Sequence, residues 1–349
     1  MATSIVNLSP STEYVATSAL RSVRASTTEN AIEAYLSKGG VKFFSAELYA
    51  YGGFVDLYDP GDIIETYFRA NNIVAADVTV GMGSESLTLH VVYCAHDMPP
   101  SHTFAMLLST SCRRVRPGSV FSFNAIPYTT PTTFTFKGAG VDSKGNTVTS
   151  SYTSADTQTG KSQYEFEVNQ ILSALRMASG NKMTRVAAFT VSARGMKLTC
   201  YVADAPPALL FRFRNIYNAF EYLDVVGDIV TKDESSYSQA FAAGNIVPYD
   251  RKTDRTYQVT TEPLPDVEFE AFRQLCESHE PQICVDGQYY GIVVTDHTIE
   301  DSTAADAQNS FKFTWRFAAR RPRDFRHAAF GLRAEDSKIF SLQYSDEYD

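Results

Sequence analysis

His90, Cys94 and His96 come nearest in residue type to a metal site, and Asp97 directly follows them. Side chains at even offsets share one face of a β-strand, so these three would converge if a strand ran that far. Zinc in proteins is held by imidazole, thiolate or carboxylate ligands. Histidines in such a setting more often lie on a solvated surface or at an interface. We predict no metal site.

The stretch 296–301 places His297 among three carboxylates. A histidine beside a carboxylate has the residue types of a general-base pair. No nucleophile and no oxyanion-binding loop lies near it in the sequence. We interpret the stretch as the polar end of a strand that runs into a loop at 302–310, and the general-base pair stays the alternative.

Residues 81–86 read Gly-Met-Gly-Ser-Glu-Ser and are a near match to a phosphate-binding loop. The third glycine is missing, and a strand rather than a helix is expected to follow, so no helix N-terminus would hold a phosphate. We therefore predict no catalytic, cofactor-binding or metal residue, and no enzyme activity.

Two arginine clusters lie in a chain whose formal net charge is −9. That acidic balance argues against sequence-independent nucleic-acid binding, which needs many Lys and Arg. Three interpretations of the clusters stay open. They could pair with carboxylates of a neighbouring subunit, such as Asp346 and Glu347, line a lumen through which DNA passes, or form a solvated face. The arginines are Arg113, Arg114 and Arg116, and Arg320, Arg321, Arg323 and Arg326.

The 5 cysteines are odd in number and include no C-x-x-C pair, so we predict free, buried thiols in a reducing cytoplasm. The N-terminal residues lack a basic segment followed by an apolar one, which predicts no secretory signal. No apolar run reaches about 18 residues, so no membrane insertion is expected. The cysteines are Cys94, Cys112, Cys200, Cys276 and Cys284.

The composition favours a folded, mainly β protein. Hydrophobic residues make up 44% of the 349 residues and aromatic residues 13%, and Thr and Val are abundant. A chain of this length predicts two or three domains. We predict a mainly β fold of β-sandwich domains with a few short helices, which gives the fold some α+β character at its margins.

The predicted organisation has four parts. Residues 1–40 are either an extended arm that orders against a neighbour or an ordinary first strand and helix, with weak helical character from Glu29 to Leu36. The remaining parts are a first β-rich domain at 41–205 with helices near 60–70 and 168–179, a second β-sandwich-like domain at 206–330 with a helix near 266–277, and an acidic tail at 331–349.

Local sequence signals predict turns and a helix start in the first domain. Residues 41–58 read as a hairpin with a Gly52-Gly53 turn, and Asp59 with Pro60 would begin a helix. Residues 142–146 read as a turn inside a polar excursion at 137–160.

The second domain begins and ends with residues that alternate apolar with polar, as in half-buried strands. The segments are 209–215, 218–222, 288–294 and 311–317.

The chain resembles structural proteins of tailed bacteriophages in residues 211–222, 289–293 and 313–317, and in the hairpin and short helix of 45–65. The likeness is to tail-tip or baseplate components of Bacteroidetes phages and prophages.

The resemblance implies a β-sandwich virion protein, assembled in the host cytoplasm, that forms a ring in a phage tail and carries no catalytic residue. The resemblance also implies that the ring is a trimer or hexamer and that it contacts other tail or neck proteins. A head-to-tail connector or tail-tube protein is the alternative within this class. A carbohydrate- or receptor-binding module, with Trp315 and exposed tyrosines stacking on sugar rings, is the alternative outside it.

Overall fold

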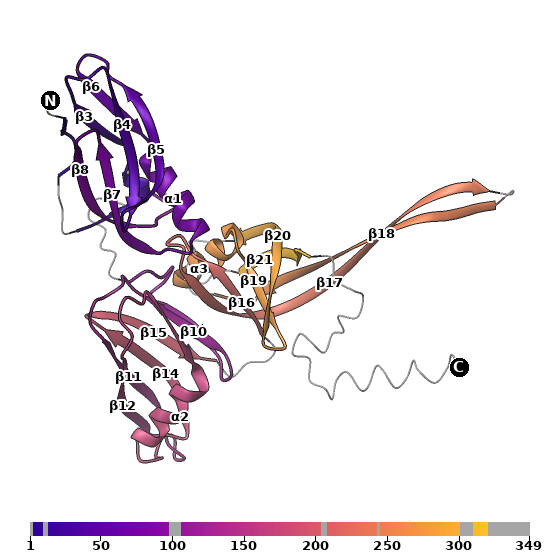
Figure 1. Ribbon diagram of the computed structural model, residues 1–349. Helices are drawn as coiled ribbons and strands as arrows, with labels where there is room; N and C mark the ends of the chain where they lie inside the picture. Colours follow the sequence, from indigo (N-terminus) through magenta and orange to yellow (C-terminus); the bar gives the residue numbers. More distant parts are fainter. Residues whose placement is uncertain are drawn as a thin grey trace.

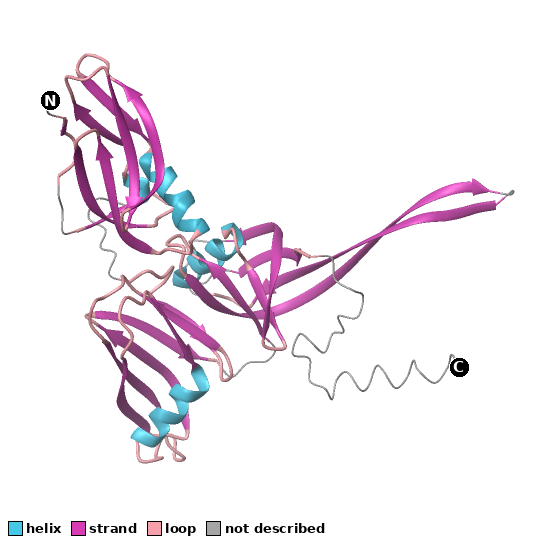
Figure 2. Ribbon diagram, in the orientation of Figure 1, coloured by secondary structure: helices cyan, strands magenta, loops and turns pink. Residues whose placement is uncertain are grey.

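The computed structural model describes residues 3–9, 13–97, 106–203, 208–242, 245–264, 266–300 and 310–319. The described chain is mainly β, as predicted, with few helices (Figure 2). Three β-rich bodies follow one another along the sequence, and a long hairpin projects away from them (Figure 1). We call them the N-terminal body (3–97), the middle body (106–203) and the barrel body (208–319). No helix in the described residues is long and apolar enough to cross a membrane.

The N-terminal body is built from two sheets whose apolar residues share one core with a helix. One sheet has the strand order β1-β3-β6 and the other β2-β8-β7-β4-β5. The elements are β1 (Ser4–Ile5), β2 (Tyr14–Ala16), η1 (Thr17–Ala19), β3 (Ser22–Ser26), β4 (Ala31–Lys38), β5 (Val41–Tyr49), β6 (Phe54–Tyr58), α1 (Pro60–Ala70), β7 (Ala75–Met82) and β8 (Glu85–Val92).

The strands β3 and β4, within the first 40 residues, belong to this core rather than to a separate arm. Val23 and Ala25 from β3, and Ile32 and Leu36 from β4, are buried in it. The segment expected to be weakly helical is strand β4, because its apolar residues alternate and pair with two neighbouring strands. Long-range pairing overrides the local helix preference of its Ala, Glu and Leu residues.

The predicted strands at 41–58 are present, but they do not form a hairpin. β5 pairs with β4, whereas β6 pairs with β3 in the other sheet. Only one bridge, between Tyr51 and Phe54, joins the two ends. The Gly52-Gly53 turn therefore carries the chain from one sheet to the other.

Helix α1 begins at Pro60, as predicted, but Asp59 has a left-handed backbone (φ 48°) and its side chain makes no cap hydrogen bond. The start of the helix is held by backbone contact instead. The Gly61 N–H donates to Leu20 O at 3.1 Å, and a Cβ on Gly61 would lie 2.1 Å from Thr17 O. Glycine is thus required at Gly61 by the close approach of the preceding chain.

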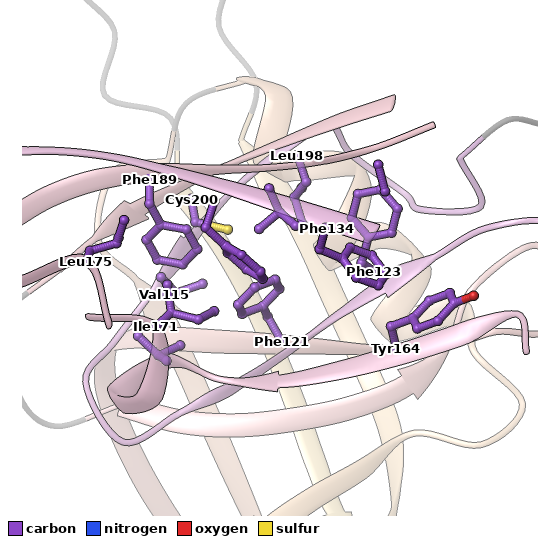
Figure 3. Packing of buried hydrophobic residues seen from close by; sticks show 14 of the residues in the cluster. Val115, Phe121, Phe123, Phe134, Tyr164, Ile171, Leu175, Phe189, Leu198 and Cys200 are labelled. Carbon is purple, nitrogen blue, oxygen red and sulfur yellow. The ribbon is translucent and has the colours of Figure 1, made fainter. Parts of the chain in front are cut away.

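The middle body has its own core, where the sequence predicted one domain over 41–205. Aromatic rings from several strands and apolar residues of one helix meet there (Figure 3). A five-stranded sheet runs β12-β11-β14-β15-β9, and β10 pairs with β13. The elements are β9 (Cys112–Val115), β10 (Val120–Asn124), β11 (Thr132–Val141), β12 (Thr147–Asp156), β13 (Gln163–Glu167), α2 (Val168–Ala178), β14 (Arg185–Ala193) and β15 (Met196–Val202).

The polar excursion at 137–160 is the β11–β12 hairpin, and its turn forms as predicted. Asp142 Oδ1 accepts the backbone N–H groups of Lys144 and Asn146, both at 2.8 Å. Ten residue pairs join β11 to β12, and no described strand pairs with the other edge of β12. β12 is therefore an open edge of the middle body.

The barrel body is a closed barrel in the order β16-β17-β18-β21-β20-β19, where the sequence predicted a sandwich. The pairing of β19 with β16 closes it, and the apolar faces of all six strands turn inward around Trp315. The elements are β16 (Ala208–Arg214), β17 (Phe220–Ala242), β18 (Asn245–Thr261), α3 (Asp266–Glu277), β19 (Gln282–Val285), β20 (Gln288–Glu300) and β21 (Ser310–Phe317). The arginines from Arg320 onward, the acidic tail, the linker Ala205-Pro206-Pro207 and most of 302–310 lie outside the described residues.

Strands β17 and β18 continue far beyond the barrel as a two-stranded ribbon, which the sequence did not predict (Figure 1). They are 23 and 17 residues long. β16 pairs with β17 only up to Val226, and β21 pairs with β18 only from Tyr257 to Thr260. We call the part beyond the barrel, 231–242 with 245–256, the arm.

Gly227 stands where the arm leaves the barrel. A Cβ there would lie 2.1 Å from the backbone oxygen of Thr260, on the paired strand. We expect Gly227→Ala to destabilise the protein by about 1–3 kcal/mol, because the two backbones must move apart.

Gly291→Ala is the matched control, since its Cβ would meet only Ala318 Cβ at an ordinary 3.6 Å. It should change the free energy of unfolding by less than about 1 kcal/mol. Urea unfolding of both variants measures the difference. Equal stability of the two variants would contradict the close approach at Gly227.

Candidate functional site

The three bodies meet around the turn between β16 and β17, residues 215–219. Tyr217 and Ala219 from this turn are buried with apolar residues of both other bodies. The shared cluster contains Ala16, Val74, Val92 and Cys94 from the N-terminal body and Leu107 and Ile126 from the middle body. We call this meeting point the junction, and it is our candidate functional site.

A buried ion pair joins the middle body to the barrel body at the junction. The Arg113 guanidinium contacts the Glu221 carboxylate, and the two side chains are 4% and 1% exposed. Glu221 Oε2 also accepts the Ser109 N–H at 2.9 Å and the Asn215 amide at 3.0 Å. Arg113 donates further to Tyr222 O at 3.2 Å. Glu221 thus has hydrogen-bonding partners from both bodies, whereas Arg113 binds Glu221 and Tyr222 of the barrel body and its Nε has no hydrogen-bond partner among the described residues.

Arg116 forms a second contact between the same bodies. Its guanidinium donates to Asp224 Oδ1 through Nε at 3.1 Å and Nη2 at 3.0 Å. Burial raises the pKa of Asp224, and the positive charge of Arg116 opposes that shift. Arg114 lies nearer the rim, 3.6 Å from Glu262 and 3.8 Å from Glu268.

This arrangement corrects one prediction for the first arginine cluster. Arg113, Arg114 and Arg116 do meet carboxylates, but those of the same chain rather than of a neighbouring subunit. The cluster is therefore not a solvated face of unpaired arginines.

The N-terminal body is attached through polar contacts of the same turn. The Asn218 amide donates to Phe68 O at 3.3 Å and to Ile73 O at 3.1 Å, at the end of α1. Arg214 Nη2 donates to Asn72 Oδ1 at 2.7 Å. Asn218 has a left-handed backbone (φ 58°), a conformation that Asn adopts more readily than most residues. One short turn therefore fixes the positions of both neighbouring bodies.

The histidine cluster of the sequence is not assembled into one site. His90 Nδ1 contacts Asp77 Oδ1 at 2.5 Å, across β7 and β8. His96 Nε2 instead lies 3.8 Å from Glu277 of the barrel body. Cys94 is buried in the junction, and burial raises the pKa of its thiol to about 11. In the part of the chain that the structure describes, no group of three or more metal-ligating side chains comes together.

The other two candidate motifs lie in strands. His297 stands opposite Phe313 in the β20–β21 ladder and its ring stacks on Phe311 at 6.2 Å between centroids. Gly83 lies in the turn of the β7–β8 hairpin, so a strand follows residues 81–86, as expected.

Trp315 is fully buried, which corrects the suggestion that it stacks on sugars. Its ring stacks on Tyr257 at 4.4 Å and packs edge-on against Phe211 at 6.0 Å. It belongs to the barrel core, at the base of the arm.

The junction residues carried a weak signal in the sequence. Glu221 and Asp224 are carboxylates inside the otherwise apolar stretch 219–226, and Asn215 and Asn218 precede that stretch. Charged residues are rarely buried unless they are paired, so such positions indicate a buried contact. The partner could not be identified, because Arg113 lies 108 residues away in the sequence.

No family model matches this chain, and no curated protein matches it. Among solved structures, it is similar to a chain of a structure described as "Virion of native gene transfer agent (GTA) particle". The similarity covers 34% of this chain and 96% of that chain, with 11% sequence identity and a TM-score of 0.25. At that TM-score the likeness supports no inference about fold or function.

Removing Glu221 should leave Arg113 buried without its counter-charge. We expect Glu221→Ala to lower the free energy of unfolding by about 3–5 kcal/mol. Glu262→Ala is the matched control, because Glu262 is about half exposed (51%) and its ion pair with Arg114 lies at the rim of the same interface. It should cost less than about 1 kcal/mol. A similar loss in both variants, measured by thermal unfolding, would contradict the importance of the buried pair.

The cysteines are all free, and their burial predicts an order of reactivity. Burial raises the pKa of Cys200 to about 12, so almost no thiolate forms at neutral pH. Cys112 and Cys284 are only partly buried. We expect iodoacetamide at pH 8 to alkylate Cys112 and Cys284 well before Cys94 and Cys200, as measured by peptide mass spectrometry. Equal rates in the folded protein would be the contrary result.

Proposed function

We propose that this chain is a non-enzymatic structural protein of a virion, and that copies of it form a ring that acts as an adaptor in a phage tail. The place in a tail rests on the resemblance of residues 211–222, 289–293 and 313–317 to tail proteins. Other tail or neck proteins would be its partners.

The junction is the observation that carries the structural role. Three separately cored bodies are held together by one turn, a mixed apolar cluster and buried ion pairs. Such an interface resists hinge motion, because any rotation would separate a buried charge from its partner. Rigid placement of several β bodies is what an assembly part needs.

The open sheet edges support a role in assembly. The arm is a two-stranded ribbon without a third strand in the described chain, and β12 is an uncovered edge of ten residues. Unpaired edges are templates for pairing with another chain, and isolated two-stranded hairpins are marginally stable in water. A subunit that carries both gains stability when a neighbour covers them.

The mass of the full-length protein, measured by light scattering at several concentrations, tests the ring. We expect a discrete closed oligomer, a trimer or hexamer, whose mass does not grow further with concentration. Negative-stain images should then show rings of one size. A chain that stays monomeric at every concentration, or one that grows without limit, would contradict a closed ring.

A further inference from the structure

We infer that the arm of one subunit pairs with strand β12 of the next copy of this chain, and that this contact closes the ring. The inference rests on the proposed ring and names the surfaces that would build it. Residues 235–242 of β17 would add a strand beside β12.

The free edge of β17 has the features of a pairing strand. From Gly227 onward, its only ladder partner in the described chain is β18. Residues 235–242 read Ser-Ser-Tyr-Ser-Gln-Ala-Phe-Ala and contain no charge, proline or glycine. Natural edge strands are usually protected by charged residues or proline, so this stretch is an unprotected edge.

The other strand of the arm is less suited to pairing. β18 carries Pro248, which has no backbone N–H to donate, and Asp250. The ladder that joins it to β17 shifts register between Ser238 and Gln239 of β17. Proline, charge and bulges are the features that keep an edge from pairing. The arm thus presents one open edge and one protected edge.

Strand β12 is the matching edge on the same chain. It reads Thr-Val-Thr-Ser-Ser-Tyr-Thr-Ser-Ala-Asp, with no charge before Asp156, and none of its residues is buried. It pairs only with β11, while α2 packs beside it and Ser150 Oγ donates to Leu175 O at 2.8 Å. The strand is therefore held by β11 and α2, with its outer edge unpaired in the described chain.

The two edges fit a second copy better than they fit each other within one chain. The arm points away from the middle body that carries β12 (Figure 1). Each chain has one arm and one β12, so a contact between them is head-to-tail. Contacts of that type produce a ring when the rotation closes. Residues 235–242 and residues 147–155 are uncharged and hydroxyl-rich, and about eight paired residues would form a ladder of ordinary strand length.

A shortened arm and a charged edge test the contact. In the first variant, Asn-Gly replaces residues 234–254, which leaves Asp233 beside Arg255, whose Nε donates to Asp233 Oδ1 at 2.6 Å in the native hairpin. Asn-Gly favours the tight turn that such a hairpin needs. The second variant is Thr149→Lys with Thr153→Lys on β12. Its control is Ala139→Lys with Thr135→Lys, the direct register partners on the central strand β11.

We expect the shortened-arm variant and the β12 variant to be monomers by light scattering. Each should still unfold in a cooperative transition, at a melting temperature lowered by no more than the stability that assembly gives the full chain. The β11 control should still assemble, because its added charges lie on the same sheet but away from the edge. A mixture of the two defective variants retains one intact arm and one intact β12, so it should form a 1:1 dimer and nothing larger.

Three outcomes would overturn the inference. If the shortened-arm variant still forms the full ring, the ring stands and the arm contact fails. If the mixture stays monomeric, or the β11 control also fails to assemble, the arm does not pair with the β12 edge. If the full-length chain is monomeric at every concentration, the ring and the arm contact fail together.

Discussion

The buried pair between Arg113 and Glu221 is the constraint on which the arrangement of the bodies depends. Taking two charges out of water is costly, and only good geometry with further hydrogen bonds offsets that cost. Both side chains are almost completely buried, and Ser109, Asn215 and Tyr222 supply the additional contacts. Such a pair adds little to stability compared with an apolar contact. What it provides is orientation, because only one placement of the two bodies satisfies both charges.

The need for a fixed orientation also explains why the junction combines polar and apolar contacts rather than apolar contacts alone. A purely hydrophobic contact between bodies is non-directional and tolerates sliding. Here the apolar cluster around Tyr217 supplies burial, while Asn218 and Arg214 bind backbone and side-chain oxygens of the N-terminal body at fixed points. The turn 215–219 can therefore hold two neighbours at once without a large interface to either.

The sequence predicted elements better than it predicted their connections. Alternating residues identified the mainly β fold, and apolar stripes located α2 and α3, because those signals are local. The arm was missed because residues 232–235 are exposed and face no core, so no burial period marks them. The closed barrel was missed because it depends on Phe211 pairing with Ile283, far apart in the sequence. For the site, the carboxylates of β17 were visible, but their arginine partners across the junction were not.

Strand β17 links the junction to the arm. Its first residues include Glu221 and Asp224, which bind the middle body, and its last residues form the projecting edge. The middle body in turn carries β12. The angle between the arm and β12 is therefore set along one continuous strand and two ion pairs, with Gly227 allowing β17 and β18 to approach closely between them. In a head-to-tail assembly that angle determines how many copies complete a circle. A rigid junction would serve the proposed ring directly, since a hinge at this point would allow several ring sizes from one sequence.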